Sequence, residues 1–162
     1  MIAVGIDPGV TGAIALLGHR HELLHVEDLP TMARGAGGGL VKRQVNAAAL
    51  AQLLREWLST HDKHEVMVAI EAMNAFPGQG VSTTFSIALT AGLIEGAVSA
   101  RGYPHELVRP QDWKRAMHLS ASKDQARMKA QRLYPEADLT RAKDHNRAEA
   151  ILIARYCYDR HA

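Results

Sequence analysis

The chain has 162 residues, a length that a single domain over residues 1–162 accounts for. With 47% hydrophobic and 22% charged residues, it has the composition of a globular protein, which excludes wholesale disorder. The single cysteine, Cys157, excludes an internal disulfide and a cysteine-based zinc finger. No uninterrupted apolar run approaches the roughly 18 residues that span a bilayer, and no basic segment opens the N-terminus. We therefore expect a cytoplasmic protein with no membrane partner.

The net charge of +2 hides an asymmetry along the chain. Residues 1–100 carry 6 Lys and Arg against 9 Asp and Glu, whereas residues 101–147 carry 11 against 6. A segment with such an excess is either the solvated face of a helix or a binding surface for nucleic-acid phosphates. Composition alone leaves both interpretations open.

Three short strands are predicted at the start of the chain, over residues 2–7, 13–17 and 22–27. Only turn residues separate them, and two short connections in a row predict antiparallel pairing. The next segment, residues 28–43, is polar and contains four glycines, so we expect a mobile loop there.

The rest of the chain alternates helical and extended patterns. Residues 46–59 have helical periodicity, with Asn46 as the expected cap. Residues 66–70 form a continuous apolar run that ends at Glu71, which is typical of a strand buried on both faces. The further expected elements are a loop over 73–82, a long helix from Ser82 or Thr83 to about Arg101, a strand over 103–108, a short helix opening at 109–112, and helices over 122–134 and 146–158.

This order of elements, βββ-α-β-α-β-α-α, predicts an α/β fold. A helix separates the third strand from the fourth, which favours parallel pairing within the same sheet. We therefore expect a mixed five-stranded sheet, in which three antiparallel strands are extended by parallel ones, with helices on both faces.

Two acidic residues, Asp7 and Glu71, each close an apolar strand. If those strands are neighbours, the two carboxylates meet at one edge of the sheet, where open α/β sheets bind ligands. The alternative is that Asp7 only starts a turn and Glu71 only ends a strand.

A third group of polar residues begins the last helix. His145 and Glu149 are four residues apart and share a helical face, and Asn146 and Glu149 nearly do. Asp144 joins that group only if it precedes the helix in an irregular segment. In the alternative interpretation, Asp144 or Asn146 caps the helix and Glu149 interacts with its positive end.

Carboxylates that converge on one point repel one another, and divalent cations remove that repulsion. Oxygen ligands without cysteine favour Mg²⁺ or Mn²⁺ over zinc. Two such ions about 4 Å apart can activate water and stabilise the leaving oxygen of a phosphodiester. The basic residues of the segment 101–147 could hold the phosphates of such a substrate: Arg109, Lys114, Arg115, Lys123, Arg127 and Lys129.

The sequence resembles the RuvC-type Holliday junction resolvases, in particular their phage-encoded branch. The resemblance is carried by residues 5–12 (Gly-Ile-Asp-Pro-Gly-Val-Thr-Gly), Ile70-Glu71 and residues 147–150 (Arg-Ala-Glu-Ala). Residues 108–114 and 122–124 also resemble the basic region of that family. The matching segments run in order over nearly the whole chain.

The resemblance implies a ribonuclease H-like fold, a homodimer, and Mg²⁺-dependent nicking of four-way DNA junctions (Mn²⁺ being the other candidate), with two ions in each active site and no small-molecule cofactor. It implies that Asp7, Glu71 and Glu149 are catalytic metal ligands. The family position three residues before the last acid is Asn146 here, so Asp144 or His145 would supply the fourth ligand, and we favour Asp144.

Further site residues follow from the same resemblance. Lys114 matches a family lysine near the scissile phosphate, and Phe76 is a candidate to stack at the junction centre. An aromatic lid on the local core is the alternative for Phe76. The expected DNA-binding residues are Asn74, Phe76, Arg109, Lys123, Arg127, Lys143 and Arg147. The long helix over 82–101 carries Gly92 and Gly96, which would allow close helix approach at a dimer interface or, alternatively, packing on the sheet.

Two other classes of function remain open. A phosphate loop of the Asp-x-Gly-x-Thr-Gly type also occurs in sugar kinases and actin-like ATPases, although those folds duplicate the domain and 162 residues hold only one. A non-catalytic module that binds branched DNA is the second alternative, and the retention of three mutually repelling acids argues against it. Cys157 lies in an apolar helix, so we expect a structural role for it.

Overall fold

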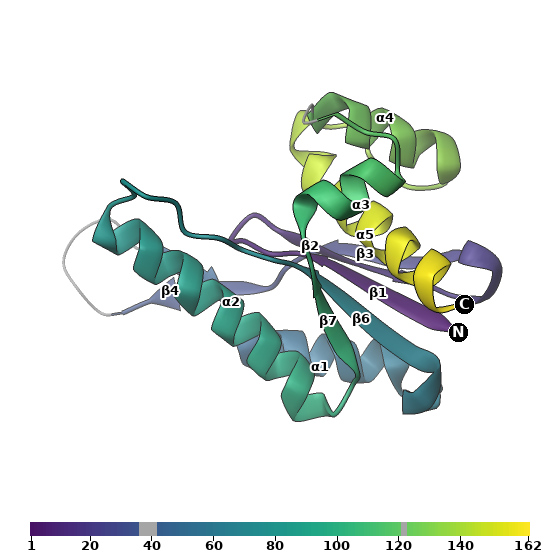
Figure 1. Ribbon diagram of the computed structural model, residues 1–162. Coiled ribbons are helices and arrows are strands. Elements are labelled where there is room, and N and C mark those ends of the chain that lie inside the picture. Colours follow the sequence, from purple (N-terminus) through teal and green to yellow (C-terminus); the bar gives the residue numbers. More distant parts are fainter. Residues whose placement is uncertain (36–41, 121–122) are drawn as a thin grey trace.

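A computed structural model describes residues 1–35, 42–120 and 123–162. Its centre is a five-stranded sheet with strand order β3-β2-β1-β6-β7 (Figure 1). β1 pairs with β2, and β2 with β3, in antiparallel fashion, whereas β1 with β6 and β6 with β7 are parallel. The expected mixed sheet is confirmed. Its strands are β1 (Ile2–Asp7), β2 (Ala13–Leu17), β3 (Leu23–Asp28), β6 (Val66–Glu71) and β7 (His105–Val108).

The helices also lie close to their expected positions. Asn46 caps the first of them, because its side-chain oxygen accepts a hydrogen bond from the backbone N–H of Ala49. Within the described residues the α-helices are α1 (Ala47–Leu58), α2 (Val81–Arg101), α3 (Pro110–Ala116), α4 (Lys123–Leu133) and α5 (His145–His161). Short 3₁₀ turns cover His19–His21, Lys63–Glu65 and Ala142–Asp144.

Small side chains on one face of the sheet let α5 approach it closely. β1 presents Ala3 and Gly5 on that face, while its larger side chains point to the other. A Cβ at Gly5 would lie 2.2 Å from the carbonyl oxygen of Ala150 and 2.3 Å from the backbone nitrogen of Ala154. Only glycine therefore fits at this point, and the packing fixes α5 across β1.

The opposite face of the sheet carries large aliphatic side chains and packs against α1 and α2. Leu50, Leu54 and Leu58 of α1 are buried there with Ile94 and Val98 of α2. α3 and α4 lie on the α5 side, where they contact α5 (Figure 1). Helices therefore cover both faces, as expected.

The segment expected to be a mobile loop over residues 28–43 contains a hairpin instead. β4 (Thr31–Arg34) pairs with β5 (Lys42–Val45) in antiparallel register. The side chain of Arg43 reaches across and donates hydrogen bonds to the hydroxyl and carbonyl oxygens of Thr31. The loop prediction is therefore wrong for the residues of these two strands. The glycines at 37–39 lie outside the described residues.

No uninterrupted apolar run reaches a membrane-spanning length, but one helix of the described residues meets a criterion based on length and mean hydropathy. α2 has 21 residues and meets that criterion by length and composition, because its Ser, Thr and Gly residues interrupt the apolar run without adding charge. Only 22% of its most apolar 18-residue window is buried. Part of this apolar helix therefore lies at the surface of the molecule.

Candidate active site

Three carboxylates from distant parts of the chain meet at one edge of the sheet. Asp7 ends β1, Glu71 ends β6, and Glu149 lies in the second turn of α5. One carboxylate oxygen from each lies within 4.8 Å of those of the other two. The predicted meeting of these acids is confirmed, whereas their catalytic and metal-binding roles stay predictions.

Sheet topology places the first two acids. β1 and β6 are parallel neighbours, so their carboxyl ends reach the same edge. A tight turn then leads away from Asp7, where a Cβ at Gly12 would lie 2.1 Å from the Asp7 carbonyl oxygen. Glu71 pairs with Val108 of β7, which fixes its backbone from the other side. The glycine at position 12 is thus part of what positions Asp7.

The third acid is placed by the docking of α5. The side-chain amide of Asn146 donates a hydrogen bond to the carbonyl oxygen of Thr11, which ties the first turn of α5 to the β1–β2 connection. Together with the close contact at Gly5, this bond fixes the position of α5 along its axis and its rotation about that axis. Glu149 is consequently only 8% exposed and directed toward Asp7 and Glu71.

The electrostatics of the cluster favour a bound cation. Burial, and after it the negative charge of Glu149, raise the pKa of Glu71 from its usual value to about 7. Lys114 and a hydrogen-bonding interaction with Trp113 oppose the rise. The indole Nε1 of Trp113 is buried and makes no full hydrogen bond with any described group, so its effect on Glu71 is small. Without a cation, therefore, the cluster retains a proton near neutral pH.

One lysine compensates part of this negative charge. The Nζ atom of Lys114, on α3, lies 3.0 Å from Oε1 of Glu149. It also lies 5.0 Å from the centre of the Trp113 ring, which holds the stem of the side chain against a buried aromatic surface. Sequence reasoning found Lys114 but gave Trp113 no role. The signal in the sequence is a tryptophan among the polar residues of this short helix, Pro110–Ala116.

The donor set fits a hard divalent cation. All three groups are carboxylates, and oxygen ligands are what Mg²⁺ and Mn²⁺ prefer. Without a cation, the raised pKa of Glu71 leaves this carboxyl partly protonated near neutral pH. A bound cation would favour the ionised form of each acid and would therefore lower that pKa.

The structure does not bring Asp144, the favoured fourth ligand, into this cluster. Its side chain is 1% exposed and accepts hydrogen bonds from the side chain and backbone N–H of Arg141, with a shortest distance of 2.7 Å. The charge and hydrogen bonds of Arg141 hold the pKa of Asp144 below its usual value. His145 instead lines a hollow of about 370 Å³ beside Thr11 and Lys143. The placement of Asp144 at the metal position is therefore wrong in this conformation.

The expected DNA-binding residues lie on several elements and differ in their exposure and partners. Asn74 and Phe76 lie in the exposed connection between β6 and α2, with the Phe76 residue 66% exposed, so it is not a lid on the core. Arg109 forms an ion pair with Asp112, Arg127 a longer one with Asp124, and Arg147 one with Asp28. Lys143 is exposed. The side chain of Lys123 lies outside the described part of the structure.

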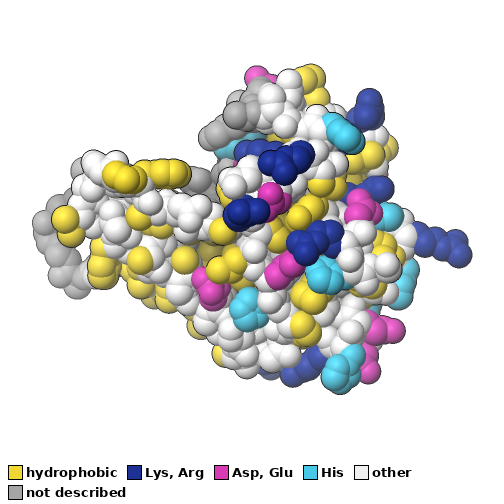
Figure 2. All heavy atoms as spheres, in the orientation of Figure 1, with side chains coloured by type: hydrophobic (Ala, Val, Ile, Leu, Met, Phe, Trp, Pro, Cys, Tyr) yellow, Lys and Arg dark blue, Asp and Glu magenta, His cyan; other side chains and the backbone are white. Residues whose placement is uncertain are grey.

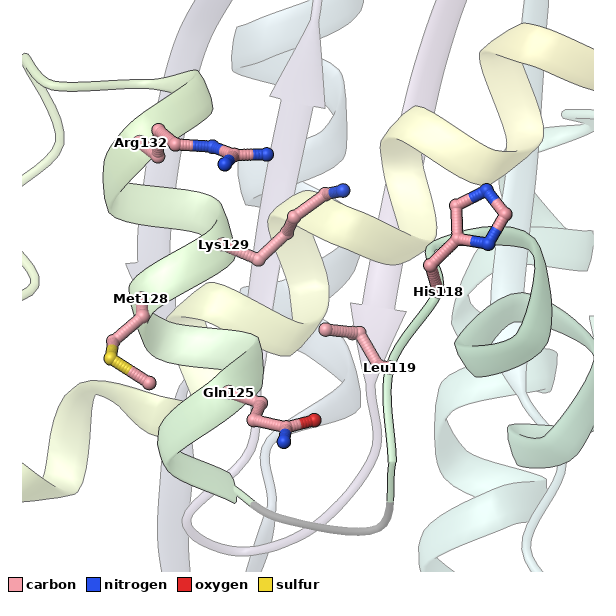
Figure 3. Close-up of a pocket in the computed structure, with 6 residues that line it drawn as sticks. All are labelled: His118, Leu119, Gln125, Met128, Lys129 and Arg132. Atoms are coloured by element: carbon pink, nitrogen blue, oxygen red, sulfur yellow. The ribbon is translucent and has the colours of Figure 1, made fainter.

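Two further hollows extend from Lys114 along the basic segment. The first, of about 550 Å³, is lined by Lys114, Arg115 and Leu119 among others. The second, of about 370 Å³, shares Leu119 and includes Lys129 and Arg132, whose side chains reach from α4 into the space beside His118 (Figure 3). Arg132 was not among the predicted residues, although its spacing of three from Lys129 places both on one helical face.

The charged side chains are unevenly distributed over the surface. On the face seen in Figure 2, Lys, Arg, Asp and Glu gather over the body that carries α3 and α5, whereas the arm built by α2 and β4 shows mainly apolar and uncharged groups. This face therefore shows a charged region over α3 and α5 and an arm on which few charged side chains are visible.

Comparison with solved structures identifies the architecture. The first match is the Thermus thermophilus RuvC in complex with a Holliday junction substrate, with a TM-score of 0.62 and 18% identity over 99% of this chain and 96% of that chain. This chain has the ribonuclease H-like fold of RuvC. A second Thermus thermophilus RuvC structure matches with a TM-score of 0.56 and 19% identity over the same shares. No protein-family model and no curated protein matches the sequence.

The RuvC fold agrees with the resemblance carried by residues 5–12 and by the segments around Glu71 and Glu149. In this chain that fold holds the three acids on the two central strands and on the helix that crosses them. The likeness extends over both chains almost in full, so α2 and the hairpin of β4 and β5 belong to the matched region together with the elements that carry the acids.

Proposed function

We propose that this protein is a structure-selective DNA endonuclease that resolves four-way junctions by divalent-metal-dependent hydrolysis of a phosphodiester. The observation that carries the proposal is the convergence of Asp7, Glu71 and Glu149 within 4.8 Å on the fold of RuvC. A RuvC of that fold is described in complex with a Holliday junction substrate. The phage-encoded branch and the cytoplasmic location remain predictions.

The three acids would hold one or two Mg²⁺ or Mn²⁺ ions. Such ions supply activation of water and stabilisation of the leaving oxygen. Glu71 would give up its proton when a cation binds, because the cation replaces the repulsion between the carboxylates by attraction. Lys114 would place its ammonium group beside the reacting phosphate, where it stabilises the charge that develops in the transition state. The products would carry a 3′-hydroxyl and a 5′-phosphate.

Substrate binding would use the hollows that lead away from Lys114. Arg115, Lys129 and Arg132 line them and can neutralise successive backbone phosphates. Phe76, exposed in the chain segment after Glu71, offers an aromatic ring for stacking on unpaired bases at the junction centre.

We further propose a homodimer formed through α2. The side chains of Val81 and Phe85 are 88% and 55% exposed, and a Cβ added at Gly92 or Gly96 would meet no described atom within 4 Å. A second copy could cover this apolar stripe and bring two acid clusters to a substrate with two-fold symmetry. Gly92→Leu would then convert the dimer to a monomer in sedimentation experiments.

The decisive experiment compares a labelled four-way junction with a linear duplex of the same sequence, each with and without chelator. The variants are Asp7→Asn and Glu71→Gln, and the matched control is Glu56→Gln, which removes an exposed acid from α1. We expect paired nicks on the junction in the wild type and in Glu56→Gln, and none with chelator or with either site variant.

Other outcomes would contradict the proposal in different ways. Equal cutting of the duplex would leave a general nuclease, and cutting by both site variants would remove the acid cluster from the mechanism. Junction binding without cutting at any divalent concentration would leave a non-catalytic DNA-binding module.

A further inference from the structure

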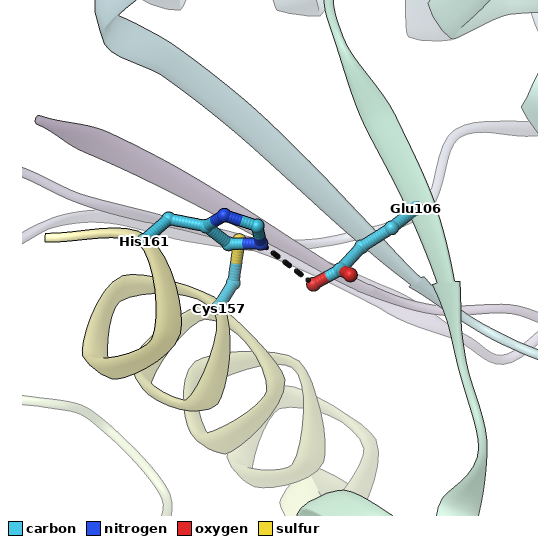
Figure 4. Close-up of side chains that lie close together, drawn as sticks. All are labelled: Glu106, Cys157 and His161. Carbon is cyan, nitrogen blue, oxygen red and sulfur yellow. Dashed lines mark hydrogen bonds and ion pairs between the residues drawn. The ribbon is translucent and has the colours of Figure 1, made fainter.

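A second group of metal-ligating side chains lies near the other end of α5. Cys157 and His161 are four residues apart on that helix, and Glu106 projects toward them from β7 (Figure 4). One atom from each residue, a sulfur, an imidazole nitrogen and a carboxylate oxygen, lies within 4.8 Å of the other two. None of these residues belongs to the acid cluster or to the hollows around Lys114.

We propose that Glu106, Cys157 and His161 form a binding site for a transition-metal ion of the zinc class. A thiolate, an imidazole and a carboxylate are ligands that Zn²⁺ accepts together, whereas Mg²⁺ prefers oxygen alone. The site would therefore select a different ion from the one proposed for Asp7, Glu71 and Glu149. This inference does not depend on the proposed nuclease activity.

The distances are close to those that a zinc ion requires. Nε2 of His161 lies 3.1 Å from Oε1 of Glu106, and two such atoms bound to one tetrahedral zinc are roughly 3.3 Å apart. The sulfur of Cys157 would need to lie roughly 3.6 Å from each of them. It already lies within 4.8 Å, so a movement of about 1 Å would bring it to that separation.

The surroundings hold the ligands in place and leave a way in. Arg160 binds Oε2 of Glu106 at 3.3 Å, which leaves Oε1 directed at His161 and orients the carboxylate, as partners behind metal ligands commonly do. His161, whose side chain is 31% exposed, also lines a surface hollow of about 400 Å³. An ion can therefore reach the site from solvent through that hollow.

The thiol is the buried end of the site. The sulfur of Cys157 is placed to donate a weak hydrogen bond to the carbonyl oxygen of Met67, at 3.8 Å, and burial raises its pKa to about 12. Without an ion, Cys157 is thus a neutral thiol at neutral pH. Binding of a zinc ion would release this proton to solvent, and the resulting thiolate would be neutralised by the ion.

The single cysteine of the chain makes the test specific. Co²⁺ is added in place of zinc, in excess Mg²⁺, to the protein and to an Asp7→Asn variant. We expect one equivalent of Co²⁺ to give a near-ultraviolet thiolate-to-cobalt absorption band in both, and Zn²⁺ to abolish it. The acid cluster contains no sulfur, so this band reports only the Cys157 site.

Variants then test the other two ligands. His161→Asn and Glu106→Gln are expected to weaken Zn²⁺ binding at least about tenfold, since even the loss of a partner behind a ligand costs about 10–100-fold. The matched control is His118→Asn, because His118 has a positive φ of 53° that asparagine tolerates well. Junction cutting in Mg²⁺ is expected to be unchanged in His161→Asn, which separates this proposal from the nuclease proposal.

Three results would overturn the inference. The first is the absence of a thiolate band at millimolar Co²⁺ in protein whose circular dichroism shows that it is folded. The second is a band of equal affinity in His161→Asn and Glu106→Gln, which would mean binding by the thiol alone. The third is a similar loss of affinity in His118→Asn.

Discussion

The substitution Glu71→Gln tests the electrostatics of the acid cluster without any assay of activity. Burial and the charge of Glu149 raise the pKa of this carboxyl from 4.5 to about 7. In the folded protein Glu71 therefore holds its proton up to about pH 7, while in the unfolded chain it loses the proton above about pH 4.5. Because the native state then binds more protons than the unfolded state, the free energy of unfolding must fall as the pH rises through this window.

The size of the effect follows from the same values. Each unit of pKa corresponds to about 1.36 kcal/mol, so a rise of roughly 2.5 units corresponds to about 3 kcal/mol at pH 7 and above. Solvent screens the partly exposed carboxyl, which reduces the expected effect to about 2 kcal/mol. Glutamine cannot ionise, so we expect the variant to be more stable than the wild type by that amount at pH 8 and by almost nothing at pH 4.

The assay is urea unfolding from pH 4 to pH 8 in chelator, for the wild type, Glu71→Gln and the exposed control Glu22→Gln. The difference between Glu71→Gln and wild type is expected to grow between about pH 4.5 and pH 7 and then to level off. Addition of Mg²⁺ is expected to stabilise the wild type but not Glu71→Gln, since only a bound ligand shifts the unfolding equilibrium. A difference in stability that is constant with pH would contradict the raised pKa of Glu71.

Three further predictions concern packing, charge and the misplaced fourth ligand. Gly5→Ala is expected to lower the free energy of unfolding by about 3 kcal/mol or more in urea titrations, because its Cβ would lie 2.2 Å from the α5 backbone. The control Gly80→Ala, where the space around the added Cβ is open, is expected to change the free energy of unfolding by less than about 1 kcal/mol. Lys114→Met is expected to slow junction cutting about 10²–10³-fold in single-turnover kinetics, and Arg55→Met on the exposed face of α1 to leave the rate unchanged. Asp144→Asn is expected to cost about 1–3 kcal/mol of stability while keeping the Mg²⁺-induced rise in melting temperature; loss of that rise would restore Asp144 as a ligand.

The acid cluster was predictable from the sequence because its first two members depend on topology alone. Asp7 and Glu71 each follow an apolar strand, and a helix between the two strands favours parallel pairing, which brings their carboxyl ends together. Glu149 was predictable because a long apolar stretch follows it, so the first turns of its helix had to lie against the body of the protein.

Asp144 was misplaced because its position depends on a single turn. A 3₁₀ turn over Ala142–Asp144 precedes α5, and within it the carboxylate of Asp144 accepts hydrogen bonds from the backbone and guanidinium of Arg141. Sequence spacing fixes which residues share a helical face, but it does not say which partner a residue at the helix boundary takes. In the structure the carboxylate of Asp144 binds Arg141, which lies three residues before it.

The hairpin and the Glu106 site were missed for a related reason. β4 and β5 are short and polar and flank a glycine-rich segment, so neither shows the alternation that marks a strand. Glu106 joins Cys157 and His161 only because β7 lies next to β6 under the last turns of α5. Contacts of this kind arise from tertiary packing and leave no local pattern in the sequence.

One helix connects both groups of ligands. Glu149 and Cys157 are eight residues apart on α5, which is about 12 Å along its axis, and the close contact at Gly5 lies beneath the residues between them. A shift of α5 by a single turn, about 5.4 Å, would remove Glu149 from Asp7 and Glu71 and Cys157 from Glu106 at once. The small residues of β1, which suit no strand by propensity, are therefore best explained by the position that they impose on this helix.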